Sequence, residues 1–131
     1  MKFIPPKKVL SPTRLRKSFH YAINGLKILI EEEQNYVVHL TTASIVIILG
    51  LIFKIHAIEW IVLVLAIQVV LTLETINTAI ENLSDFVSTE RSDKIKRIKY
   101  LAAAGVLIAA IAAAIVGLII FGPRIWAAIV S

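Results

Sequence analysis

The sequence predicts an all-α integral membrane protein in which an N-terminal amphipathic surface helix precedes three transmembrane helices. The 131 residues are 58% apolar and have a mean hydropathy of +0.84, which is too apolar for an ordinary soluble domain. Three apolar blocks stand out, at 37–53, 60–73 and 101–121. A spanning helix needs about 20 mostly apolar residues, and the chain length allows a single domain over 1–131.

The positions of the basic residues indicate the topology. Of the 14 Lys and Arg residues, seven precede the first apolar block and five lie between the second and the third. Only Lys54 and Arg124 lie in the two remaining segments. Because cytoplasmic loops collect Lys and Arg, the N-terminus is expected inside and the C-terminus outside. The net charge of +5 is then a topology signal, and no nucleic-acid partner is expected.

The N-terminal segment reads as an arm followed by a surface helix. Residues 1–12 are basic and rich in proline, which predicts a mobile arm without the apolar core of a secretory signal peptide. Ser11 and Pro12 suit the N-cap and the first position of a helix. At helical spacing, 13–35 has a polar side and an apolar side, which is typical of a helix lying in the membrane interface. Glu33 falls on the apolar side, so it either has a partner there or the helix ends before it and the carboxylate is solvated.

The three spans are expected at 36–54, 57–87 and 100–122. The second block has only 14 apolar residues, so its helix must continue through the acidic sequence that follows. Residues 88–99 are expected to form a charged, partly helical cytoplasmic connection. Small residues make the third span thin, Gly122-Pro123 is expected to end it, and 123–131 is expected to be an external tail. Glu59 is expected to pair with Lys54 in the external turn.

The second span carries a polar stripe at membrane depth. Its members lie within an arc of roughly 100° on a helix: Glu74, Asn77, Thr78, Glu81 and Asp85. Carboxylates inside a membrane are costly and usually mark function. A cation pathway through the membrane would also use such carboxylates, although these acids cluster at the inner end of the span.

The residues around this stripe supply parts for phosphoryl transfer. Glu33 and Glu81 are expected at similar depth, and paired carboxylates suit Mg²⁺. Glu74 lies deeper, where it fits a general base acting on a lipid hydroxyl. Lys99 and Arg14 are cytoplasmic cations that suit phosphates. The chain has no cysteine and no glycine-rich nucleotide loop of the soluble kinase or NTPase type.

Three segments of the sequence resemble those of a known family. ETINTAIENLSD is similar to the signature E-x-x-N-[ST]-x-x-E-x-x-x-D of the prokaryotic diacylglycerol kinases and the related undecaprenol kinases. An E-x-N-aromatic-x-x-H element of the family's first span is matched by Glu33, Asn35, Tyr36 and His39. KYLAAAGVLIAA is similar to the start of the family's third span, and the resemblance covers about 14–121.

The resemblance implies a small membrane kinase that works as a homotrimer in the bacterial inner membrane, with sites shared between protomers. ATP with Mg²⁺ would phosphorylate a lipid alcohol, either diacylglycerol or undecaprenol. Glu74 would be the general base, and Glu33 and Glu81 would hold the metal. The nucleotide would lie among Arg14, Tyr21, Glu33, Asn77, Glu81, Glu90 and Lys99, and the supporting residues would be Asp85 and Asn35.

Two positions depart from the family pattern. The element after the second span reads Glu90-Arg91-Ser92 and lacks the usual His, and Tyr100 follows Lys99 where the family has Asp. Tyr100 would either stack on adenine or fill part of the nucleotide site. These departures leave a catalytically weakened family member as an alternative. The sequence does not choose between the two lipids, nor between swapped and unswapped protomers.

Overall fold

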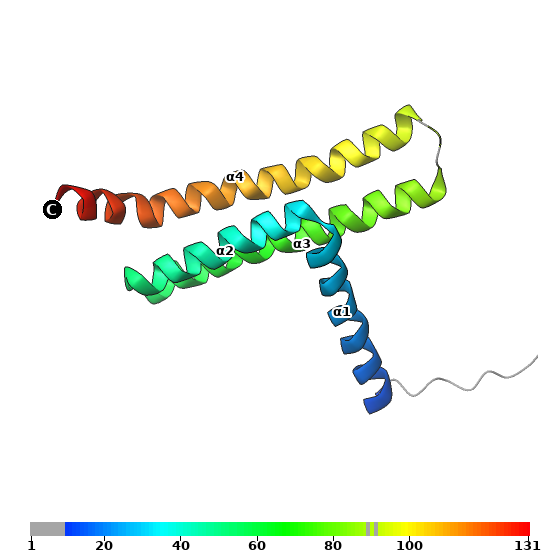
Figure 1. The fold of residues 1–131 in the computed structure, drawn as a ribbon, viewed down its shortest axis with the longest axis horizontal. Helices are drawn as coiled ribbons and strands as arrows, with labels where there is room; N and C mark the ends of the chain where they lie inside the picture. Colours follow the sequence, from blue (N-terminus) through cyan, green and yellow to red (C-terminus); the bar gives the residue numbers. More distant parts are fainter. Residues whose placement is uncertain (1–9, 89, 91) are drawn as a thin grey trace, which may run out of the picture. The chain divides into compact units, whose positions relative to one another are not determined.

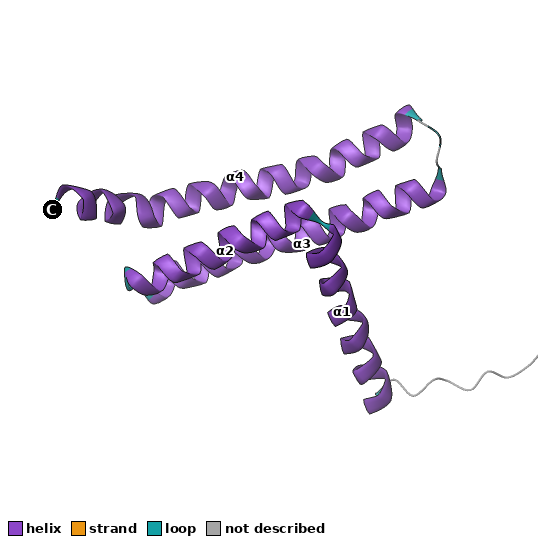
Figure 2. Ribbon diagram, in the orientation of Figure 1, coloured by secondary structure: helices purple, strands orange, loops and turns teal. Residues whose placement is uncertain are grey.

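The computed structural model describes residues 10–88, 90 and 92–131, and they form four helices (Figures 1 and 2). These are α1 (Pro12–Glu32), α2 (Gln34–Ile52), α3 (Ala57–Val87) and α4 (Asp93–Val130). The predicted all-α fold is confirmed, whereas most of the predicted arm at 1–12 lies outside the described residues. The chain divides after Glu33 into an N-terminal unit and a unit made of α2, α3 and α4, and each is described by itself.

Helix α1 begins as expected and ends earlier than predicted. Pro12 lies in its first turn after Ser11, whose backbone is extended. The helix ends at Glu32, and Glu33 is extended, with φ −109° and ψ 100°. The prediction of one helix over 13–35 is therefore wrong at its C-terminal end. An acidic side chain destabilises the C-terminus of a helix and stabilises the N-terminus of the helix that follows. The three glutamates at 31–33 therefore favour a helix break among them.

The other three helices have the properties of membrane spans. Each is long and apolar enough to cross a bilayer. Large aliphatic side chains on all three are exposed, including Ile48, Leu65 and Ile119. Exposed apolar faces of this extent suit lipid or another protein rather than water. These properties indicate a membrane protein.

Helix α3 packs extensively against the antiparallel α4 and over a shorter stretch against α2 (Figure 1). The turn between α2 and α3 is tight, because Lys54 adopts a left-handed backbone with φ 50° and the His56 N–H donates to Glu59 Oε2 at 2.8 Å. Gly50 is required at this crossing, since a Cβ there would lie 2.7 Å from the Trp60 ring. The turn therefore fixes how α2 lies on α3.

An ion pair joins α3 and α4 at the end near this turn. The Arg124 guanidinium donates to both carboxylate oxygens of Glu59, at 2.8 and 2.9 Å, and also to the Ile120 carbonyl oxygen. Glu59 therefore pairs with Arg124 and not with Lys54 as expected. The prediction that Gly122-Pro123 ends the third span is also wrong, because α4 continues to Val130. Pro123 removes one backbone donor, and Arg124 anchors the helix immediately beyond it.

At the opposite end α4 begins at Asp93, directly after Ser92. The predicted connection at 88–99 therefore contains helix, since 93–99 is the first part of α4. An acidic residue in the first turn favours the positive N-terminus of a helix, and Asp93 occupies that turn. As a result, Lys99 extends from a regular helix.

Candidate functional site

The polar stripe of α3 changes from buried to exposed along the helix. Glu74, Asn77 and Thr78 are buried, with 3%, 7% and 5% of their surfaces exposed. Glu81 is partly buried, and Asp85 is exposed. A carboxylate as buried as Glu74 is rare in proteins unless it has a partner, and Glu74 does have a polar interaction. The stripe therefore connects the interior of the helix unit to its surface.

Small residues of α4 lie level with the buried part of the stripe. Two ion pairs, Glu59 with Arg124 and Asp85 with Lys99, fix the register of the two helices. Interpolation between these pairs places Glu74 level with Ala109 and Ala110, and Ala109 is itself buried. Small side chains allow close approach of two helices. At this level α4 can therefore pack closely against α3.

The middle of the stripe presents oxygen atoms. Asn77 Nδ2 donates to Glu81 Oε1 at 3.2 Å. The buried Asn77 Oδ1 and Thr78 Oγ1 have no hydrogen-bond partner among the described residues. Carboxylate and amide oxygens are the ligands that Mg²⁺ prefers, so Glu81 and Asn77 fit a magnesium ion chemically. In the described part of the chain, no three His, Asp or Glu side chains gather into a metal site.

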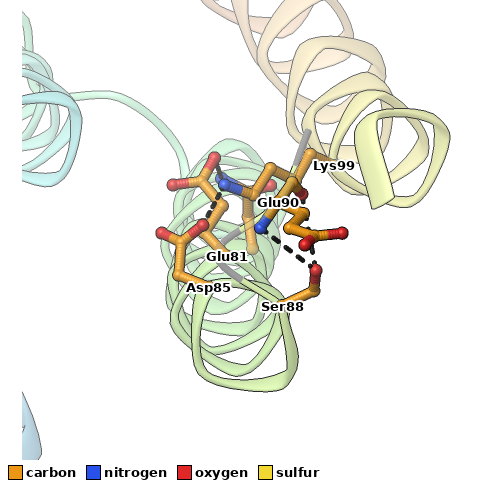
Figure 3. Close-up of polar contacts among 6 residues, drawn as sticks. Glu81, Asp85, Ser88, Glu90 and Lys99 are labelled. Atoms are coloured by element: carbon orange, nitrogen blue, oxygen red, sulfur yellow. Dashed lines mark hydrogen bonds and ion pairs between the residues drawn. The ribbon is translucent and has the colours of Figure 1, made fainter. Parts of the chain in front are cut away.

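At the exposed end of the stripe, Lys99 of α4 forms an ion pair with Asp85 of α3 (Figure 3). Ser88 and Glu90 lie beside this pair, and the Glu90 N–H donates to Ser88 Oγ at 3.2 Å. These residues line a cavity of about 670 Å³ together with Lys96. The cavity contains both ammonium and carboxylate groups, as a site for a metal-bound polyphosphate does.

Tyr100 lies beside Lys99, where the family pattern has an acid. Its side chain is 63% exposed, and Lys96 Nζ lies 5.6 Å from the centre of its ring. This is the geometry of a cation–π contact. The exposed ring is available for stacking, which was one of the two roles that the sequence left open.

Several predicted site residues belong to different units of the chain. Arg14, Tyr21 and Glu33 lie in the N-terminal unit. Their meeting with Glu81 and Lys99 therefore stays a prediction. Asn35 is exposed in the first turn of α2.

A largely apolar groove of about 500 Å³ lies in the unit formed by α2, α3 and α4. Its walls come from α2, α3 and α4, with His39 and Thr42 as its polar lining. Leu71 and Ala110 line the groove and lie within one helical turn of the level of Glu74. An apolar surface thus begins close to the buried carboxylate.

Sequence reasoning did not find two polar features of this region. The first is the contact between Asp85 and Lys99. From the sequence, Lys99 is expected at the nucleotide and Asp85 in a supporting role, without an expected contact between them. Their expected positions, both near the cytoplasmic end of the spans, were a signal for this contact. The isolated hydroxyl of Thr78 depends on a side-chain rotamer and on the packing of α4, for which the sequence offers no signal.

A carboxylate buried in a membrane-spanning helix usually marks a functional site, and this one belongs to a stripe that ends at a cavity with two lysines. The profile of the family described as prokaryotic diacylglycerol kinase matches residues 20–121. The undecaprenol kinase of Bacillus subtilis (strain 168) is 34% identical over 112 residues, which cover 86% of this chain and 91% of that protein. A diacylglycerol kinase of Synechocystis sp. (strain ATCC 27184 / PCC 6803 / Kazusa) is 37% identical over 101 residues, covering 76% of this chain and 58% of that protein.

The chain belongs to the prokaryotic diacylglycerol kinase family. It is therefore a membrane enzyme, a lipid kinase of the diacylglycerol and undecaprenol kinase type, whose reaction depends on a nucleotide. This assignment argues against the alternative of a cation transporter.

The ion pair at the cavity leads to a first prediction. If Lys99 binds nucleotide phosphates, as the family resemblance implies, Asp85→Asn is expected to raise the KM for ATP by about twofold to fivefold with little change in kcat, because Lys99 loses the carboxylate that holds it over the cavity. The size follows from the modest energy of an exposed ion pair. ATP titrations of the reconstituted enzyme measure it. Lys94→Met, a change at an exposed lysine of the same helix, is the control, and an unchanged KM for Asp85→Asn would remove Asp85 from this role.

Proposed function

We propose that this lipid kinase transfers the γ-phosphoryl group of ATP to the hydroxyl of diacylglycerol or undecaprenol at the cytoplasmic face of the membrane. The product is phosphatidic acid or undecaprenyl phosphate. Both lipid alcohols are named in the relatives of this chain. The observation that carries the proposal is the almost complete burial of Glu74 at one end of a polar stripe whose other end is the Lys99 cavity.

Glu74 is the general base in this proposal. Its carboxylate accepts the hydroxyl proton as the lipid oxygen attacks the γ-phosphorus, and the bond from that phosphorus to the β–γ bridging oxygen breaks to release ADP. The apolar groove near Glu74 supports the presence of a lipid chain beside the carboxylate. The distance from Glu74 to Asp85 is about 17 Å along the helix at 1.5 Å per residue. The stripe therefore links the depth of the lipid to the aqueous side.

Glu33 and Glu81 would hold Mg²⁺ together with the nucleotide. When bound, the ion neutralises charge on the phosphate oxygens during transfer. The hydrogen bond from Asn77 keeps the Glu81 carboxylate in place and leaves Asn77 Oδ1 as a further oxygen donor. Glu33 lies at the break between α1 and α2, where its backbone is not part of either helix.

The nucleotide is bound by cationic and polar side chains in this proposal. Lys99 and Arg14 contact its phosphates, since ammonium and guanidinium groups form charge-assisted hydrogen bonds with phosphate oxygens. Tyr100 stacks on the adenine. The remaining contacts come from Tyr21, Asn77 and Glu90, with Asp85 and Asn35 as supporting residues.

The active form is a homotrimer in the bacterial inner membrane, with the N-terminus cytoplasmic, the C-terminus external, and α1 lying as an amphipathic helix in the interface. The exposed apolar side chains of α2, α3 and α4 support contacts with lipid and with further copies of the chain. The excess of basic residues before α2 and between α3 and α4 supports the orientation.

A lipid panel tests the proposed function. The purified chain, reconstituted in phosphatidylcholine vesicles, is incubated with γ-labelled MgATP and either diacylglycerol, undecaprenol or no added alcohol. Labelled phosphatidic acid or undecaprenyl phosphate is expected, and the preferred alcohol identifies the substrate. A folded, oligomeric preparation that labels neither lipid would contradict the proposal and favour a family member without catalysis.

A further inference from the structure

The apolar groove and the polar stripe lie on one face of α3. The α3 residues that line the groove are Leu63, Ala66, Ile67, Val70 and Leu71. At about 100° per residue, these five positions and Glu74 fall within an arc of about 140°. The same face therefore changes from apolar to polar at Glu74. From Glu74 to Leu63 it extends about 17 Å, at 1.5 Å per residue. Such a surface is complementary to an amphiphile whose polar end lies at the carboxylate.

Small residues of α4 keep another wall of the groove hollow. Ala110, Ala113, Ala114 and Gly117 all line it. A Cβ atom at Gly117 would have no atom of another described helix within 4 Å, so the space above this glycine is open. Leu118, which also lines the groove, is 71% exposed. The groove therefore opens sideways onto the apolar surface of the unit, where a lipid can enter it from the membrane.

The lining of the groove indicates what kind of chain it accepts. Among the described residues, its side chains include only two hydrogen-bond donors, His39 and Thr42, and the Thr42 hydroxyl already donates to the Val38 carbonyl oxygen at 2.9 Å. A buried carbonyl without a donor costs free energy. Diacylglycerol brings two ester carbonyls close to its hydroxyl, whereas a polyprenyl alcohol has no polar atom beyond its hydroxyl. The groove volume of about 500 Å³ also lies in the range of pockets for one small ligand, about 300 to 1,000 Å³.

We propose that this groove binds the hydrocarbon chain of a polyprenyl alcohol and that Gly117 determines whether the chain fits. The hydroxyl of the alcohol lies at Glu74, and the chain follows α3 towards the end near Glu59 and Arg124. Gly117 lies seven residues beyond Ala110, which is level with Glu74, and is thus about 11 Å along the groove. This inference rests on the proposed function, and it selects undecaprenol from the two alcohols named there. Gly117 is a specificity-determining residue and takes no part in the chemistry.

Filling the groove at Gly117 tests this inference. In Gly117→Leu the new side chain enters the groove, and the KM for undecaprenol is expected to rise by at least about tenfold. That factor corresponds to the lost burial of about two methylene groups. The KM for ATP should stay within twofold of the parent, because the groove and the Lys99 cavity share no lining residue.

Gly105→Leu is the matched control. Gly105 lies in the same helix, and a Cβ atom there would also have no atom of another described helix within 4 Å. It does not line the groove. Both KM values of Gly105→Leu should therefore stay within twofold of the parent.

A photoreactive alcohol locates the chain without any substitution. The reagent is a polyprenyl alcohol with a diazirine about nine bonds from its hydroxyl, since an extended chain advances about 1.2 Å per bond. Illumination in phosphatidylcholine vesicles should produce adducts at Ala113, Ala114 and Gly117, identified by fragment mass spectrometry. Excess undecaprenol should suppress these adducts, and excess dioleoylglycerol should not. Ile111 and Ile119, which are exposed on α4 outside the groove, report non-specific labelling from the bilayer.

The outcomes separate the groove from the reaction. A parent that phosphorylates undecaprenol while Gly117→Leu has the same KM for it overturns the groove as the chain site and leaves the proposed function intact. Equal adducts at Ile111 and Ile119 do the same. A preference for dioleoylglycerol overturns the choice of alcohol. Loss of the oligomer in Gly117→Leu, seen by chemical cross-linking, shows that a second copy fills the groove and also overturns the inference. A parent that labels neither lipid contradicts the proposed function, and the adducts then decide the groove on their own.

Discussion

Glu74→Gln is expected to lower kcat for lipid phosphorylation by at least about a thousandfold. Loss of a positioned general base costs roughly 10² to 10⁴ in rate, and the buried site offers no solvent base to replace it. The amide has nearly the same shape as the carboxylate, so the lipid and the nucleotide should still bind. The KM for ATP is therefore expected to change by less than about threefold, as it does when an interaction made only in the transition state is lost.

An unfolding measurement on Glu74→Gln separates loss of the general base from loss of the fold. The amide keeps the shape and a hydrogen-bonding oxygen of the carboxylate, so Glu74→Gln is expected to resist unfolding in mixed micelles about as well as the parent. Glu32→Gln, which removes a charge from an exposed position in α1, is the control and should keep full activity. Retention of more than a tenth of the parental kcat in Glu74→Gln would show that another group accepts the proton.

The course of the polar stripe was readable from the sequence because helical periodicity alone places Glu74, Asn77 and Thr78 on one face. The structure adds that Glu74, Asn77 and Thr78 are all buried. The small residues of α4 were the sequence signal for close helix packing. The ends of the helices were less predictable. Proline and glycine usually end a helix, but at Pro123 the distant ion pair between Arg124 and Glu59 anchors the continuation.

Helical periodicity does not predict contacts between residues that are distant in the sequence. The pairing of Lys99 with Asp85 joins residues of α3 and α4, and it forms only in the antiparallel arrangement in which these helices pack. The break at Glu33 could have been expected from the three consecutive glutamates near a helix C-terminus. The apolar content of 13–35 favoured a continuous helix instead.

Metal specificity is expected to change when a thiolate replaces either predicted metal ligand. In Glu81→Cys and in Glu33→Cys, turnover with Mg²⁺ should fall by at least about a hundredfold, because the ion loses an oxygen ligand that stabilises charge in the transition state. Zn²⁺ should restore a larger share of turnover in these variants than in the parent, since thiolates prefer softer metals. The natural chain has no cysteine, so each variant carries a single thiol.

The same variants test whether Glu33 and Glu81 bind one and the same ion. If Glu33 and Glu81 bind the same Mg²⁺, removal of the second ligand costs much less than removal of the first, so the double variant is far more active than independent effects predict. Titrations with Mg²⁺ and Zn²⁺ of the two single variants and the double variant measure this coupling. Glu32→Cys supplies a thiol one residue from Glu33 and should keep the parental preference for Mg²⁺. A parental preference in Glu33→Cys as well would leave the metal to α3 alone, with Glu81 and Asn77 as its protein ligands.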